Sequence, residues 1–136
     1  MGEADAALKW PNDVVLRGAP AALPGWGSSR KLAGVLAEVV RDASGQEAVI
    51  LGIGVNVAQR ELPVPWATSL ALAGVEVTPQ ELLAAIGQEL VAALAVWQNE
   101  GQQGLHADLV AASDTLGRDV RVETAGGGHL EGTAET

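Results

Sequence analysis

The only two lysines of the chain lie in two short polar motifs, Lys9 in "KWPND" and Lys31 in "RKLAG". Lysines needed only for solubility would be expected on exposed helices, yet the helical part of this sequence contains none. An ammonium group at the start of an apolar strand is well placed to pair with a carboxylate or phosphate. We therefore predict that Lys31 meets an anionic ligand; the alternative is that it only ends a strand in solvent.

Glycines near Lys31 and further along the chain predict an open surface for such a ligand. Gly34 carries no Cβ, so a ligand can approach the backbone there. In "GIGVN", Gly52 and Gly54 are two residues apart and face the same side of a strand. Asn56 would place an amide donor and acceptor on that same side. We predict a smooth trough, and the alternative is a bend in a barrel that requires small residues.

Asn12 and Asp13 interrupt an otherwise apolar stretch between two short strands. Pro-Asn-Asp is typical of a turn, which explains the proline and the asparagine. It does not explain why the turn should neighbour both lysine motifs in sequence. A carboxylate beside a lysine-lined trough can bind a metal that carries phosphates, or steer an incoming amine.

The strands that must position these residues are predicted in residues 6–57. "ALKW" and "VVLR" are short, and "KLAGVLAEVV" and "AVILGIGVNV" fit an antiparallel pair joined by "RDASGQE". Residues 17–30 contain two prolines and three glycines, which indicates a loop. A loop of this length inside a compact domain is often functional.

Residues 66–113 are predicted to be helical. The clearest helix covers 78–98, where Thr78, Pro79 and Glu81 fit a capped start, and its apolar stripe is expected to lie on a sheet. A shorter helix is predicted through "LHADLVAAS". From Gly117 on, "RDVRVE" and "HLEGTAE" flank "TAGGG" and predict a hairpin. The expected fold class is α+β, with a mixed, mainly antiparallel sheet packed on helices.

Composition argues against several classes of protein. A net charge of −9 argues against sequence-independent nucleic-acid binding, which needs clustered cations. The absence of cysteine excludes thiolate metal sites and thiol nucleophiles. No apolar run is expected to span a membrane, and the amino end lacks a basic signal-peptide region. We therefore expect a cytoplasmic protein without membrane partners.

Three motifs in this order resemble the biotin–protein ligase (biotin–[acetyl-CoA-carboxylase] ligase) family: "LKWPNDVVL", "RKLAGVLAEV" and "VILGIGVNV". The closing "LGRDVRVETAGGGHLEGTAE" resembles the start of its SH3-like C-terminal domain. The resemblance implies a class II synthetase-like biotin/lipoate ligase fold, with a partial catalytic domain over 1–114 and a truncated SH3-like domain over 115–136. It implies that biotin and ATP form biotinyl-5'-AMP, and that biotin then passes to a lysine of a biotin carboxyl carrier protein domain.

The resemblance also implies roles for individual residues. Lys31 would contact the biotin carboxylate and the α-phosphate and stabilise charge as it develops. Asn12 and Asn56 would serve the adenylate phosphates and Mg²⁺. Asp13 would orient the acceptor lysine or take its proton. The slot for the fused rings of biotin would be lined by Gly34, Gly52 and Gly54.

Departures from the family pattern qualify these expectations. No arginine-rich "GRGRRG"-like run occurs in the sequence, and we expect no DNA-binding domain, so nucleic-acid binding is not implied. We expect a partial ligase whose unpaired strand edges promote self-association. Two alternatives stay open: a lipoate–protein ligase-like enzyme, and a non-catalytic remnant that binds biotinyl-adenylate or a carrier domain.

Overall fold

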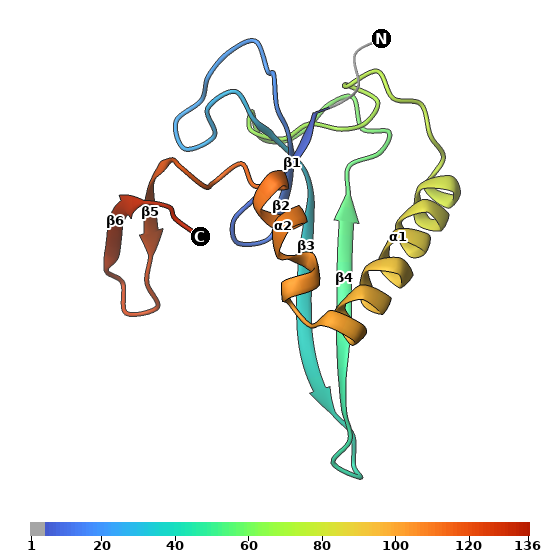
Figure 1. Cartoon of the computed structure of the whole chain (residues 1–136). Helices are drawn as coiled ribbons and strands as arrows, with labels where there is room; N and C mark the ends of the chain where they lie inside the picture. Colours follow the sequence, from blue (N-terminus) through green and yellow to red (C-terminus); the bar gives the residue numbers. More distant parts are fainter. Residues whose placement is uncertain (1–4) are drawn as a thin grey trace.

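The computed structural model describes residues 5–136 and has the predicted α+β architecture (Figure 1). The expectation about a signal peptide concerns the amino end, and residues 1–4 of that segment lie outside the described residues. One antiparallel sheet has the strand order β1(Ala6–Lys9), β2(Asp13–Leu16), β3(Arg30–Arg41), β4(Glu47–Val55). The elements that follow are α1(Pro79–Glu100), α2(Gln103–Ala112), β5(Asp119–Glu123) and β6(His129–Thr133).

The long hairpin of β3 and β4 confirms the predicted antiparallel pair. The two strands pair from Arg41 and Glu47 at the tip to Ala33 and Val55 at the base. Its turn is closed by Asp42, whose Oδ1 accepts hydrogen bonds from the Ser44 hydroxyl and from backbone N–H groups. These bonds, led by the Ser44 hydroxyl, lower the pKa of Asp42.

Helix α1 begins where the sequence predicts. The Thr78 hydroxyl accepts from the Glu81 backbone N–H at 3.2 Å, and a Glu81 carboxylate oxygen accepts from the Thr78 N–H at 2.9 Å. Pro79 occupies the first turn, so the capping box is confirmed. The bond from the Thr78 hydroxyl is the main reason that the pKa of Glu81 is lowered.

Residues 66–77 are not helical, so the prediction of helix across all of 66–113 is wrong at its start. Their backbone instead pairs with the beginning of β3. The Lys31 N–H donates to the Trp66 carbonyl at 2.7 Å, and the Thr68 N–H donates to the Lys31 carbonyl at 2.8 Å. Once these donors and acceptors serve a strand, they cannot form the bonds of a helix.

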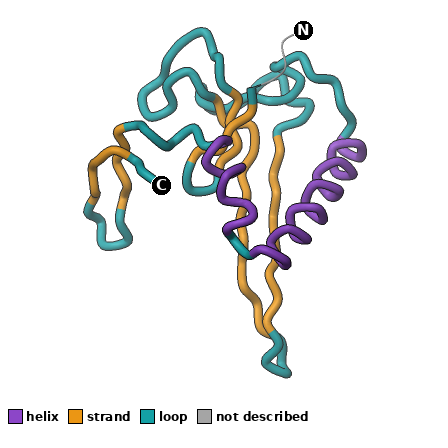
Figure 2. Tube along the Cα trace, viewed as in Figure 1, coloured by secondary structure: helices purple, strands orange, loops and turns teal. Residues whose placement is uncertain are grey.

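The apolar stripe of α1 does not lie on the sheet, which corrects a second expectation. α1 packs against α2, and α2 packs against β1, so the shorter helix is the one that packs on the sheet, at its β1 edge (Figure 2). Only the segment around the start of α1 reaches the core: Val77, just before the helix, and Leu82, in its first turn, pack against the cluster of Leu16, Leu32, Ala33 and Leu70. Leu83, Val91 and Trp97 therefore remain exposed.

By length and composition alone, α1 could cross a membrane, and none of its apolar window is buried inside the structure. This differs from the expectation that no apolar segment reaches such a length. A single helix of this kind is weak evidence, because the core helix of a soluble protein passes the same test.

Candidate functional site

Lys31 and Asp13 form an ion pair on one face of the sheet. The distance from Lys31 Nζ to Asp13 Oδ1 is 2.6 Å, and the two side chains are 38% and 14% exposed. Asp13 is the first residue of β2 and lies opposite Gly34 on β3. The ammonium group is thus fixed in place yet remains accessible to a ligand from solvent.

An irregularity in β3 decides which face Lys31 occupies. Val14 pairs with Ala33 while Val15 pairs with Lys31, so β3 contains one extra residue, Leu32, at this point. In a regular strand, Lys31 and Gly34 would face opposite sides, because side chains alternate. A bulge re-aims side chains, and here Lys31 Nζ lies 3.4 Å from the position that a Gly34 Cβ would occupy.

Three glycines form an open surface beside this ion pair, which we call the glycine trough: Gly34, Gly52 and Gly54. Gly34 pairs with Gly54 across β3 and β4, and Gly52 lies two residues from Gly54, so all three share the face of Asp13. Within residues 5–136, a Cβ added at Gly54 would meet nothing within 4 Å. The predicted trough therefore has room for a ligand next to Lys31.

Asn12 and Asn56 brace the backbone at the two ends of this surface. Asn12 Nδ2 donates to the Val35 carbonyl at 2.9 Å, and the Val35 N–H donates back to the Asn12 carbonyl at 2.8 Å. Asn56 follows the end of β4, and its Nδ2 donates to the Thr68 carbonyl at 2.9 Å. Both amides are oriented by these bonds, which leave the Oδ1 oxygen and a second Nδ2 N–H of each side chain for further contacts.

Lys9 and the loop of residues 17–30 meet at a pair of stacked indoles. The rings of Trp26 and Trp66 stack with centroids 6.5 Å apart and planes inclined by 12°. Lys9 Nζ lies 4.7 Å from the centroid of the Trp26 ring, a cation–π contact. Because the Trp66 carbonyl also accepts the Lys31 N–H, this cluster adjoins the start of β3. The sequence patterns predicted no specific role for Lys9 or for this loop.

Asp114 is a buried carboxylate that sequence reasoning missed. Its side chain is 3% exposed, and its Oδ1 accepts from Arg17 Nε at 2.8 Å and from an Arg118 guanidinium N–H at 2.7 Å. Its Oδ2 accepts from the Ser29 hydroxyl at 2.9 Å. The bond to Asp114 is the main cause of a raised pKa for Arg17. The available signal was that Asp114 is the one charged residue in "LVAASDTLG".

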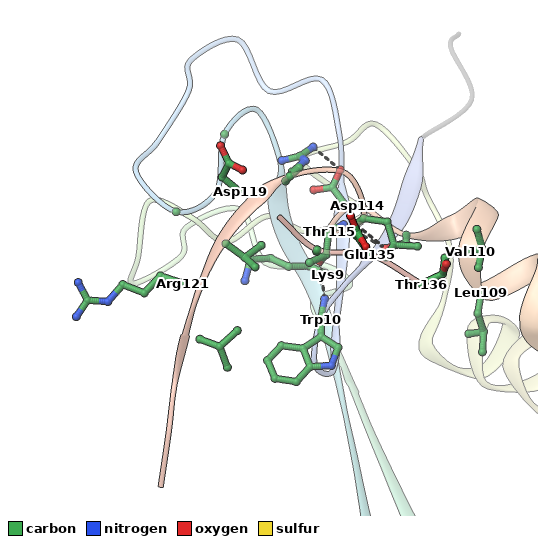
Figure 3. Close-up of a pocket in the computed structure, with 18 of the residues that line it drawn as sticks. Lys9, Trp10, Leu109, Val110, Asp114, Thr115, Asp119, Arg121, Glu135 and Thr136 are labelled. Atoms are coloured by element: carbon green, nitrogen blue, oxygen red, sulfur yellow. Dashed lines mark hydrogen bonds and ion pairs between the residues drawn. The ribbon is translucent and has the colours of Figure 1, made fainter. Parts of the chain in front are cut away.

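A hollow of about 820 Å³ lies elsewhere. It is bounded by the β1–β2 turn, α2 and the β5–β6 hairpin, and Figure 3 shows Lys9, Trp10, Asp114 and Arg121 around it. None of the predicted site residues lines this hollow. The glycine trough is an open face of the sheet and encloses no volume. We therefore place the candidate site by the chemistry of Lys31 and not by the position of this hollow.

The β5–β6 hairpin confirms the predicted change from helix to strand. Its strands pair from Asp119 and Thr133 to Glu123 and His129. Two strands do not establish an SH3-like domain, and the boundary between residues 114 and 115 stays a prediction.

Comparisons with known proteins agree with this geometry. Residues 2–56 match the Biotin/lipoate A/B protein ligase family. The chain is 42% identical over 133 residues to the biotin–[acetyl-CoA-carboxylase] ligase of Mycobacterium tuberculosis, covering 96% of this chain and 44% of that protein. It is 31% identical to the bifunctional ligase/repressor BirA of Escherichia coli, covering 74% of this chain and 29% of BirA.

The fold comparison gives the same result. The chain superposes on the biotin protein ligase of Aquifex aeolicus, solved in complex with biotin and ATP, with a TM-score of 0.72 and 25% identity. That match covers 94% of this chain and 49% of the Aquifex chain. The chain thus spans half or less of the length of these relatives. By sequence and by fold, it is related to the biotin protein ligases.

Proposed function

We propose that the face formed by Asp13, Lys31 and the glycine trough is the acid-and-phosphate part of a biotinyl-adenylate site. The observation that carries this proposal is the Lys31 ammonium, held by Asp13 at the edge of an open, Cβ-free surface. A fixed cation is suited to a reaction in which two anions, a carboxylate and a phosphate, must be brought together. The related Aquifex ligase binds biotin and ATP, which supports this choice of substrates.

In the first step, a biotin carboxylate oxygen attacks the α-phosphorus of ATP. The bond from that phosphorus to the bridging oxygen breaks, and pyrophosphate leaves. Lys31 would stabilise the charge on the carboxylate and the α-phosphate, while the glycine trough would receive the fused rings. In the second step, the Nζ of a carrier-domain lysine attacks the biotinyl carbonyl, an amide forms and AMP leaves. Asp13 would orient that amine or accept its proton.

Magnesium would enter this site with the phosphates of ATP. Within residues 5–136, no group of three or more His, Asp or Glu side chains could hold a metal ion. The predicted site residues offer the Oδ1 atoms of Asn12 and Asn56 and the carboxylate of Asp13, and Mg²⁺ often keeps waters and substrate phosphates as most of its ligands. We therefore assign Mg²⁺ a role through ATP rather than a protein-only site.

The carrier partner and the cytoplasmic setting are part of the same proposal. The carrier would be a biotin carboxyl carrier protein domain, because the Mycobacterium tuberculosis relative is named as a ligase for acetyl-CoA carboxylase. A lipoate ligase-like activity is the second candidate, because the matching family includes lipoate ligases.

Binding of biotinyl-5'-AMP to the purified chain, measured by calorimetry, tests the proposal directly. We expect binding of biotinyl-5'-AMP and a weaker response to lipoyl-5'-AMP. A clear preference for the lipoyl compound would favour the lipoate alternative. Absence of binding by either compound to a folded preparation would contradict the adenylate site itself.

Gly54 provides a separate test of the trough. Gly54→Val is expected to keep the fold, because a Cβ there meets nothing within 4 Å and valine suits a strand. The new side chain would fill the trough, so we expect biotinyl-5'-AMP affinity to fall by about tenfold or more, by loss of the surface that receives the rings. Calorimetry measures this change.

Gly132→Val is the matched control for Gly54→Val. Gly132 also lies in a strand, and a Cβ added there also meets nothing within 4 Å. This variant is expected to bind as the parent chain does. Equal affinity in both variants would show that the rings bind elsewhere.

A further inference from the structure

We propose that Asp114 is a positioning residue that holds the Lys31 end of the site in place; this inference rests on the proposed function of that site. Asp114 lies about eighty residues beyond Lys31 in sequence, and it lines the hollow described above, which no residue of the glycine trough lines. Its carboxylate nevertheless joins both ends of the loop of residues 17–30 to Arg118 at the start of the β5–β6 hairpin, and its backbone N–H bonds to strand β1.

The first connection runs from Asp114 to β3. The Ser29 hydroxyl donates to Asp114 Oδ2 at 2.9 Å, and Ser29 is 2% exposed. Ser29 directly precedes Arg30, the first residue of β3, and lies two residues before Lys31. Arg17, at the other end of the loop, donates to Asp114 Oδ1 and to the Ser113 carbonyl. Both ends of the loop are therefore held by this one short segment.

The second connection runs from residues 113–115 to β1 and the turn that precedes Asp13. Ser113 and Leu8 form a parallel bridge, and the Asp114 N–H donates to the Leu8 carbonyl at 2.7 Å. The Trp10 N–H donates to the Thr115 hydroxyl at 2.9 Å, a contact visible in Figure 3. Residues 113–115 thus line the outer edge of β1, on the side away from β2.

These two connections converge on one ion pair. Lys31 follows the segment that Ser29 anchors, and Asp13 follows the turn that residues 113–115 flank. A displacement of either side lengthens the 2.6 Å distance between Lys31 Nζ and Asp13 Oδ1. Satisfied networks around a buried group specify one arrangement, and removing the charge of the Asp114 carboxylate weakens the bonds that it accepts from Arg17, Arg118 and Ser29.

The experiment uses the chain's two lysines as reporters. Lysine labelled with ¹³C and ¹⁵N gives side-chain NMR signals from Lys9 and Lys31 alone. A Lys9→Arg sample assigns them, and Asp13→Asn gives the Lys31 signal that results when the ion pair is broken. In Asp114→Asn, studied well below its unfolding temperature, we expect the Lys31 signal to move toward the Asp13→Asn position. We expect biotinyl-5'-AMP affinity to fall by about tenfold.

Ser29→Ala provides a milder second variant in case Asp114→Asn fails to fold. It removes only the bond that joins Asp114 to the start of β3, and the same direction of change is expected. Its matched control is Ser28→Ala, at the exposed neighbouring serine. Asp119→Asn is the control for the loss of a carboxylate, because Asp119 bonds to Thr133 within the hairpin. Both controls should leave the Lys31 signal in place.

A lowered unfolding temperature with an unmoved Lys31 signal would show that Asp114 only stabilises the fold, and would overturn the inference. The signal does not depend on any ligand. If the parent chain binds no biotinyl-5'-AMP while the Lys31 signal still moves in Asp114→Asn, the proposed function fails and the coupling between Asp114 and Lys31 is supported.

Discussion

Replacing Lys31 with alanine is expected to slow biotinyl-adenylate formation by about 10²–10³-fold, the usual cost of losing one donor to a developing anion. Lys31 is the cation that Asp13 fixes beside the glycine trough, so alanine removes the charge and leaves Asp13 without its partner. The reaction is best measured in a chimera, in which this chain replaces the matching 44% of the Mycobacterium tuberculosis ligase. Biotin-dependent exchange of pyrophosphate into ATP reports the first step alone.

Two further variants separate the position of Lys31 from its charge. Lys31→Arg keeps a cation but changes its shape, and we expect it to recover only part of the rate, because guanidinium and ammonium bind anions with different geometry. Arg41→Ala removes a cation from the far tip of the hairpin, where Arg41 pairs with Glu47. This control should exchange pyrophosphate at the parent rate. Exchange by Lys31→Ala at that same rate would remove Lys31 from the mechanism.

The isolated chain is expected to show no steady biotinylation of a carrier domain. A biotinyl-adenylate is a mixed anhydride, and enzymes protect such intermediates from water by closing the site. Here Lys31 is 38% exposed and the trough is open, so nothing within residues 5–136 covers a bound adenylate. Incubation of the chain with ATP, Mg²⁺, labelled biotin and apo-carrier measures incorporation. Incorporation that rises in proportion to monomeric chain would contradict this expectation.

We also expect the isolated chain to self-associate. β4 is an edge strand of the sheet, and Val49, Ile50 and Ile53 on it are exposed apolar residues. An exposed apolar edge is a template for pairing with another chain. Ile50→Lys should therefore shift the sedimentation profile toward monomer, whereas Leu109→Lys, an equivalent change on α2, should not. A parent chain that sediments as a monomer at high concentration would show that the β4 edge does not pair.

The sequence by itself determined the local elements and the composition of the site. Alternation and turn residues predicted the β3–β4 hairpin, and Thr78, Pro79 and Glu81 predicted the start of α1, because these signals act between residues close in the chain. The spacing of Gly52 and Gly54 predicted a shared face for the same reason. The order of three motifs was sufficient to indicate similarity to the biotin–protein ligases.

The tertiary structure decided what depends on residues distant in sequence. Strict alternation would place Lys31 on the wrong face, and only the extra residue Leu32 in β3 turns it toward Gly34 and Asp13. The pairing of residues 66–68 with β3 overrode a helical expectation because those backbone groups found partners far along the chain. The Asp114 carboxylate accepts hydrogen bonds from residues as many as 97 positions away in sequence, and local sequence patterns cannot predict such contacts.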